Sequence, residues 1–189
     1  MNHRLVTACA LFALAATPAW AECSRELVSY NFPAQRLDEA LQALTERTGC
    51  VIEADTALVG ERQAPTLAGT YRPEEALWAL LKASGLEGYP TDEGLEVSQR
   101  EQAWVREHTE ALRARLASRP ELDEAKRDAY LYELDELERS VQELARQQGF
   151  ISAAERASYQ RSIEEVTRQL EKAQDADSDA RKPLNRAAP

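Results

Sequence analysis

The sequence of 189 residues has few of the side chains on which most catalytic and metal sites depend. It contains only two histidines and three cysteines. His3 lies in an N-terminal segment that we expect to be removed, which leaves His108. One histidine is too few for a histidine-based metal site or a Ser-His-Asp triad. There is also no glycine-rich phosphate loop and no Gly-x-Ser-x-Gly motif. We therefore expect neither an enzyme nor a bound cofactor or metal ion.

Basic residues are in the minority. Lysine and arginine together number 23 against 33 aspartates and glutamates, so the formal net charge is −10. Nucleic-acid binding requires a basic face, and we expect no nucleic-acid partner. The hydrophobic fraction of 43% is enough for a protein with a core.

Residues 1–21 have the pattern of a secretory signal peptide. Arg4 precedes an apolar run from Leu5 to Ala16, and an Ala-x-Ala site follows. We expect cleavage between Ala21 and Glu22. The apolar run of about 12 residues is too short for a permanent membrane span, and no later run is longer. The expected product is an exported protein without a membrane span, located in the periplasm if the source is a Gram-negative bacterium.

Two cysteines remain after this cleavage, Cys23 and Cys50. An even number of cysteines in an exported chain favours a disulfide. Closing this loop is worth about 3–4 kcal/mol in the chain-entropy treatment. The alternative is that Cys50 is a buried free thiol and that Cys23 lies at a frayed terminus.

The composition changes near residue 98. Six of the seven glycines lie between residues 22 and 98, whereas residues 99–174 are dense in alanine, leucine, glutamate, arginine and glutamine. These residues favour helices. We therefore expect an α+β domain over residues 22–98 and a helical module over residues 99–174. Residues 175–189 are polar and lack periodicity, so we expect a disordered tail there.

Hydrophobic periodicity within residues 22–98 alternates between strand and helix. Two units follow one another, and they predict a small α+β sandwich of two β-α-β-like units. The expected elements are a strand over 28–32, a helix over 37–48, a strand over 50–54, a strand over 67–71, a helix from Pro73 to Gly85, and strands over 86–89 and 95–98.

Four stretches in this domain resemble a known family. They are YNFPAQRLDEAL (30–41), TGCVI (48–52), LAGTYRPEEAL (67–77) and LLKASGL (80–86). In this order and spacing they resemble the secretin and TonB N-terminal short domain, over about residues 26–99. The resemblance implies a periplasmic protein-interaction module. In TonB-dependent signalling receptors such a domain contacts the periplasmic part of a membrane anti-sigma factor.

A helical module follows here in place of the receptor's outer-membrane barrel, which is similar to the barrel-less component of Vre-type cell-surface signalling. We therefore expect an anti-sigma factor's periplasmic domain as the partner. Binding would use an exposed strand edge. The candidate edges are the strand with Leu67, Gly69 and Tyr71 and the strand with Leu95 and Val97. The alternative is a structural role, as a secretin-associated or scaffold protein that assembles through its helices.

The helical module contains three amphipathic segments, over residues 99–117, 120–148 and 152–174. Ser118 with Glu121, and Ser152 with Glu155, have the spacing of capping boxes. A short turn at Gly149 predicts antiparallel neighbours in a bundle or hairpin. His108 lies on an apolar helical face, where a packing role is expected. The second helix is expected to be the longest, so that part of its apolar seam could bind a partner or a second copy.

Overall fold

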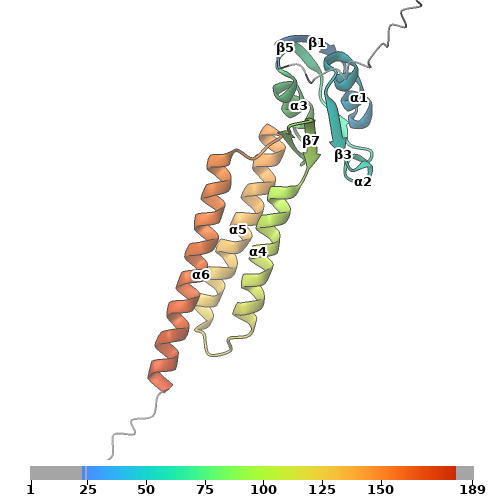
Figure 1. Cartoon of the computed structure of the whole chain (residues 1–189). Coiled ribbons are helices and arrows are strands. Elements are labelled where there is room, and N and C mark those ends of the chain that lie inside the picture. The colour runs from blue at the N-terminus through green and yellow to red at the C-terminus, as the bar shows by residue number, and fades with distance from the viewer. Residues whose placement is uncertain (1–22, 24, 182–189) are drawn as a thin grey trace, which may run out of the picture.

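The structure is a computed structural model that describes residues 23 and 25–181. It consists of a mixed α/β head, up to Ser98, and a bundle of three long helices that extends from one end of the head (Figure 1). This is the expected fold class. The expected signal peptide, with its cleavage site between Ala21 and Glu22, lies outside the described residues.

The strands of the head form three small sheets. The strands are β1 (Val28–Phe32), β2 (Gln35–Arg36), β3 (Val51–Ala54), β4 (Gln63–Ala64), β5 (Leu67–Tyr71), β6 (Glu87–Pro90) and β7 (Gly94–Ser98). Antiparallel pairing joins β1 to β5 and β2 to β4. The third sheet has the order β3-β7-β6, in which β3 is parallel to β7 and β6 is antiparallel to it.

Two helices, α1 (Leu37–Thr48) and α3 (Pro73–Leu81), supply most of the core of the head, and α2 (Thr56–Val59) is a single turn. The apolar stripe of each long helix is buried, as its periodicity predicts. The fully buried leucines of this core are Leu37, Leu44, Leu77, Leu80, Leu81 and Leu86.

Helix α3 ends four residues before Gly85, where the sequence pattern placed its end. Lys82 already has an extended ψ of 140°. The next backbone amide, that of Ala83, donates a hydrogen bond of 2.8 Å to the carbonyl of Arg146 in the bundle. A contact distant in sequence therefore ends the helix early.

The bundle consists of α4 (Arg100–Ala117), α5 (Glu124–Gln148) and α6 (Ala153–Arg181), which run antiparallel in succession (Figure 1). The expected seams face one another. The buried apolar side chains are Val105, Leu112 and Leu116 from α4, Leu134, Val141 and Ala145 from α5, and Tyr159, Ile163, Val166 and Leu170 from α6.

One of the two expected capping boxes is confirmed. The Glu155 carboxylate accepts from the Ser152 amide at 2.7 Å, and the Glu155 amide donates to Ser152 Oγ at 3.2 Å. The box at Ser118 is wrong, because Ser118 Oγ donates instead to the Arg115 carbonyl at 2.8 Å. The carboxylate of Asp123 accepts from the Lys126 amide, so α5 begins at Glu124.

Two further expectations about the bundle are wrong. With 29 residues, α6 is longer than α5, which has 25. Residues 175–181, expected to belong to a disordered tail, continue α6 to Arg181. The acidic and alanine-rich sequence there has no apolar seam, but its residues are compatible with a helix that continues from a well-packed one. Residues 182–189 lie outside the described residues.

Cys23 and Cys50 form a disulfide across a sequence separation of 27 residues. It fastens the start of the head to the strand after α1. Reduction is expected to lower the free energy of unfolding by about 3 kcal/mol, because the unfolded chain regains the entropy of an open loop. Urea unfolding with and without dithiothreitol measures the difference. A Cys23→Ala/Cys50→Ala variant should not respond to the reductant, and equal midpoints for the oxidised and reduced protein would contradict the prediction.

Candidate functional site

The strand with Leu95 and Val97 is not an open edge, contrary to the sequence-based expectation. This strand, β7, is the central strand of its sheet and has a neighbour on each side. The side chains of Leu95 and Val97 are only 2% and 3% exposed. Both belong to the core, so this pair is not available to a partner.

The outer edge of β6 is covered by the bundle. The Gly88 amide donates to the carbonyl of Gly149, in the turn between α5 and α6, at 2.8 Å. The Gly88 carbonyl accepts from Trp78 Nε1 at 2.9 Å. Both backbone groups at this position are therefore satisfied within the protein, which leaves no template for another strand.

The strand with Leu67, Gly69 and Tyr71 is β5, and its only strand neighbour among the described residues is β1. Its other edge carries no described strand. Gly69 is exposed and Tyr71 is half-buried, whereas the Leu67 side chain is 2% exposed and belongs to the core. The edge of β5 therefore remains a candidate for strand addition, with Gly69 and part of Tyr71 accessible.

A second edge was missed by the sequence analysis. In the described part of the chain β3 pairs with β7 and with no other strand. Val51, at its start, is 58% exposed. Beside β3 lies a groove of about 510 Å³, whose apolar lining consists of Leu41, Ile52, Ala54 and Val59. The Arg36–Asp38 ion pair, at 2.9 Å, lies at the same groove. An open edge with an apolar groove beside it is the arrangement that binds extended peptides.

A buried carboxylate joins the head to the bundle. Glu87, on β6, has no exposed surface. Its carboxylate accepts four hydrogen bonds of 2.9–3.0 Å, from the backbone amides of Glu101 and Gln102, from Gln102 Nε2 and from Tyr89 Oη. The two amides belong to the first turn of α4. Gln99, the residue before this helix, makes no side-chain cap. Glu87 thus caps α4 from a different domain, where a negative charge also suits the helix dipole.

Tyr89 reinforces this junction. Burial, together with the neighbouring carboxylate of Glu87, raises the pKa of Tyr89 well above its usual range, so the hydroxyl stays protonated and donates to Glu87. The same hydroxyl accepts from the Ile151 amide at 3.3 Å. The guanidinium of Arg100 lies 3.8 Å from the centre of the ring. Trp78, on α3, stacks on Phe150, in the turn between α5 and α6, with 4.3 Å between ring centres.

His108, on α4, lies against Trp104 of the same helix. Its Nδ1 lies 2.8 Å from the Trp104 carbonyl one turn earlier, and its ring lies against that of Trp104. Within residues 23 and 25–181, no group of three or more metal-binding side chains comes together. No described helix combines the length and apolar character needed to cross a bilayer.

Comparisons with known proteins give a partial likeness. No protein-family model matches the sequence, and no curated protein matches it. Two solved structures of a Pseudomonas aeruginosa receptor match part of the chain: FpvA bound to a heterologous pyoverdine, and the outer-membrane ferripyoverdine receptor bound to ferripyoverdine. Each match has 20% identity and a TM-score of 0.37, and each covers 39% of this chain. The chain spans only 10% of the length of each receptor chain.

Proposed function

We propose that this protein is an exported, non-enzymatic interaction module of cell-surface signalling. Its head contacts the periplasmic region of a membrane anti-sigma factor and so regulates transcription that depends on a sigma factor. The observation that carries the proposal is the open β3 edge beside its apolar groove. The anti-sigma factor, as the class of partner, follows from the resemblance of residues 26–99 to the secretin and TonB N-terminal short domain.

A partner strand added to β3 would gain main-chain hydrogen bonds along the edge. Its alternate side chains would enter the groove against Ile52 of β3, Leu41 of α1 and Val59 of α2. With a formal charge of −10, the protein attracts a basic partner surface, which speeds the encounter at low ionic strength. The edge of β5 offers a second place for a strand.

The alternative function, an assembly adaptor that works through its helices, is less favoured by the packing of the bundle. The apolar seams of α4, α5 and α6 are buried against one another. The large exposed apolar side chains in the described residues are Leu27, Val51 and Tyr132, and only Tyr132 lies on the bundle. One exposed tyrosine on a charged helix does not make an oligomerisation seam.

Val51→Lys is expected to weaken partner binding at least tenfold, because a lysine on an edge strand opposes the addition of another strand. The test immobilises the chain from Glu22 onward and captures proteins from a membrane extract of the source organism. We expect it to capture a single-pass membrane regulator. Tyr132→Lys is the matched control, since it replaces a similarly exposed apolar side chain on α5, and it should capture normally. Equal capture by Val51→Lys, or capture of an envelope-assembly component instead, would contradict the proposal.

A further inference from the structure

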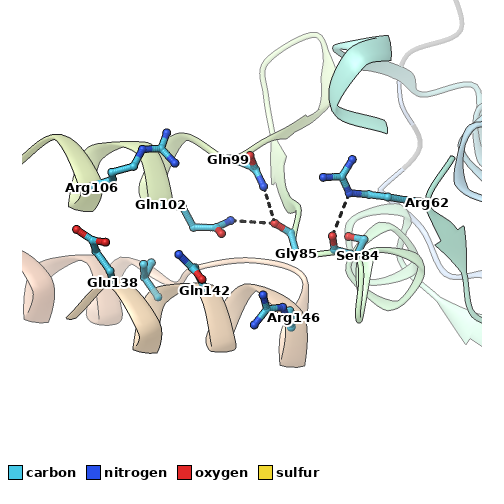
Figure 2. Close-up of a pocket in the computed structure, with 10 residues that line it drawn as sticks. Arg62, Ser84, Gly85, Gln99, Gln102, Arg106, Glu138, Gln142 and Arg146 are labelled. Atoms are coloured by element: carbon cyan, nitrogen blue, oxygen red, sulfur yellow. Dashed lines mark hydrogen bonds between the residues drawn. The ribbon is translucent and has the colours of Figure 1, made fainter. Parts of the chain in front are cut away.

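A polar cavity of about 240 Å³ lies between the head and the bundle. Figure 2 shows side chains that line it, among them Arg62 of the head, Arg106 of α4, and Arg146 and Gln142 of α5. Three arginines therefore line one small cavity in a chain whose formal charge is −10. This concentration of positive charge is opposite in sign to that of the protein as a whole.

The carboxylate that lines the cavity does not neutralise these arginines. Glu138 is engaged by Arg113, whose Nη1 lies 2.5 Å from it, and it also accepts from the Thr109 hydroxyl. Arg113 is not among the residues that line the cavity. Arg113 also pairs with Asp135 at 2.6 Å, so Glu138 shares this cation with a second carboxylate. The charged residues that line the cavity are three arginines and one glutamate, which leaves an excess of positive charge.

Neutral groups hold Arg62 in place. Its Nε donates to the Ser84 carbonyl at 3.1 Å, and its Nη1 donates to the Leu58 carbonyl. Two backbone carbonyls fix the direction of this guanidinium without cancelling its charge. A positioned, uncompensated arginine loses little side-chain entropy when it binds an anion.

The other two arginines are similarly available. Arg106 makes no side-chain hydrogen bond or ion pair with any described residue, although its backbone carbonyl accepts from Thr109. The guanidinium of Arg146 has a long contact of 3.8 Å with Glu143, one turn earlier on α5. By contrast, Gln99 and Gln102 donate their side-chain amides to the Gly85 carbonyl (Figure 2), so they brace the wall of the cavity.

We propose that this cavity binds a small oxyanion with two or more negative charges, and that the bound anion strengthens the docking of the head on the bundle. Arginine forks match the paired oxygens of phosphate and carboxylate. The volume is below the range of about 300–1,000 Å³ typical of drug-sized ligands, so the ligand is a group the size of phosphate or a small dicarboxylate. Because Arg62 belongs to the head and the other two arginines to the bundle, one anion contacts both parts. This inference does not depend on the proposed partner.

Thermal unfolding of the full chain in sodium phosphate, and separately in sodium succinate, tests the site. Sodium chloride at the same ionic strength is the reference for screening. We expect 10 mM of the better anion to raise the melting temperature by about 3 °C, since a ligand that binds only the folded state stabilises it. A larger shift in phosphate assigns the site to phosphate, and a larger shift in succinate assigns it to carboxylates.

Arg106→Gln is expected to weaken anion binding about tenfold, measured by calorimetry, because a charge-assisted hydrogen bond is worth about 1.5 kcal/mol or more. Its melting temperature in chloride should remain close to that of the unchanged protein, since this exposed side chain has no hydrogen bond or ion pair with a described residue to lose. Arg161→Gln is the matched control, because it removes an exposed arginine from α6 outside the cavity. Equal shifts in all three salts, or an undiminished affinity in Arg106→Gln, would overturn the proposal.

Discussion

Replacing Glu87 with alanine is expected to destabilise the protein by about 4 kcal/mol, because three buried donors lose their acceptor at a cost of about 1–3 kcal/mol each. The donors are the Glu101 amide, the Gln102 amide and the Tyr89 hydroxyl. The side chain of Gln102 loses a fourth bond to the same carboxylate but keeps its bond to the Gly85 carbonyl. The loss is larger than that of an ordinary helix cap, because the site has no exposed surface and its donors are not in contact with bulk water.

Urea unfolding and thermal melting measure this loss, and a fall of about 10 °C in melting temperature is expected. Trypsin should also cleave the linker near Gln99 and Arg100 faster, because α4 no longer starts from a fixed point. Glu93→Ala is the control, since Glu93 is exposed in the turn of the same β6–β7 hairpin. It should change the free energy of unfolding by less than about 0.5 kcal/mol. A change of less than 1 kcal/mol in Glu87→Ala would show that the cap is not a principal link between head and bundle.

The elements of the head followed from local pattern, because alternation and helical spacing are properties of neighbouring residues. Residues 28–32, 37–48 and 67–71 form the expected strands and helix. The pairing of the strands did not follow from the pattern. Alternation in the last strand cannot show that β3 lies parallel to it on one side and β6 antiparallel on the other. For this reason the edge at Leu95 was predicted to be open and the edge at Val51 was overlooked.

The contact between head and bundle at Glu87 was also not predictable, because it too depends on residues that are distant in the sequence. In a chain with 33 acidic residues, Glu87 looks like any solvated glutamate, and its role depends on amides that lie 14 and 15 positions away. The sequence did carry one indication of this role: no good capping side chain precedes α4. The residue at that position is glutamine, a weak cap. A helix that begins without its own cap is a reason to look for an acceptor elsewhere.

Gly149→Ala is expected to cost about 4 kcal/mol, although the sequence indicates only a helix stop at this position. Gly149 has a φ of +78°, where a side chain costs about 1–2 kcal/mol. An added Cβ would also lie 2.4 Å from the carbonyl oxygen of Trp78, a backbone atom of the head. The turn must then withdraw, which breaks the bond from the Gly88 amide and the stacking of Trp78 on Phe150, at about 1 kcal/mol each.

Gly85→Ala separates the backbone part of this cost from the part that comes from the close contact with Trp78. Its φ of +74° is nearly the same, but an added Cβ meets nothing closer than Arg146 Cγ at 3.9 Å. Gly85→Ala is therefore expected to lose only the backbone part, about 1–2 kcal/mol. The difference between the two variants in urea unfolding measures the docking of head on bundle at this contact. If the two losses are equal, this contact contributes nothing to stability, and the Glu87 network and the other bonds between head and bundle hold the two parts together. If Gly149→Ala loses about 2 kcal/mol more, the glycine is required because two backbones meet there, and the α5–α6 turn is a second link between head and bundle beside the carboxylate cap.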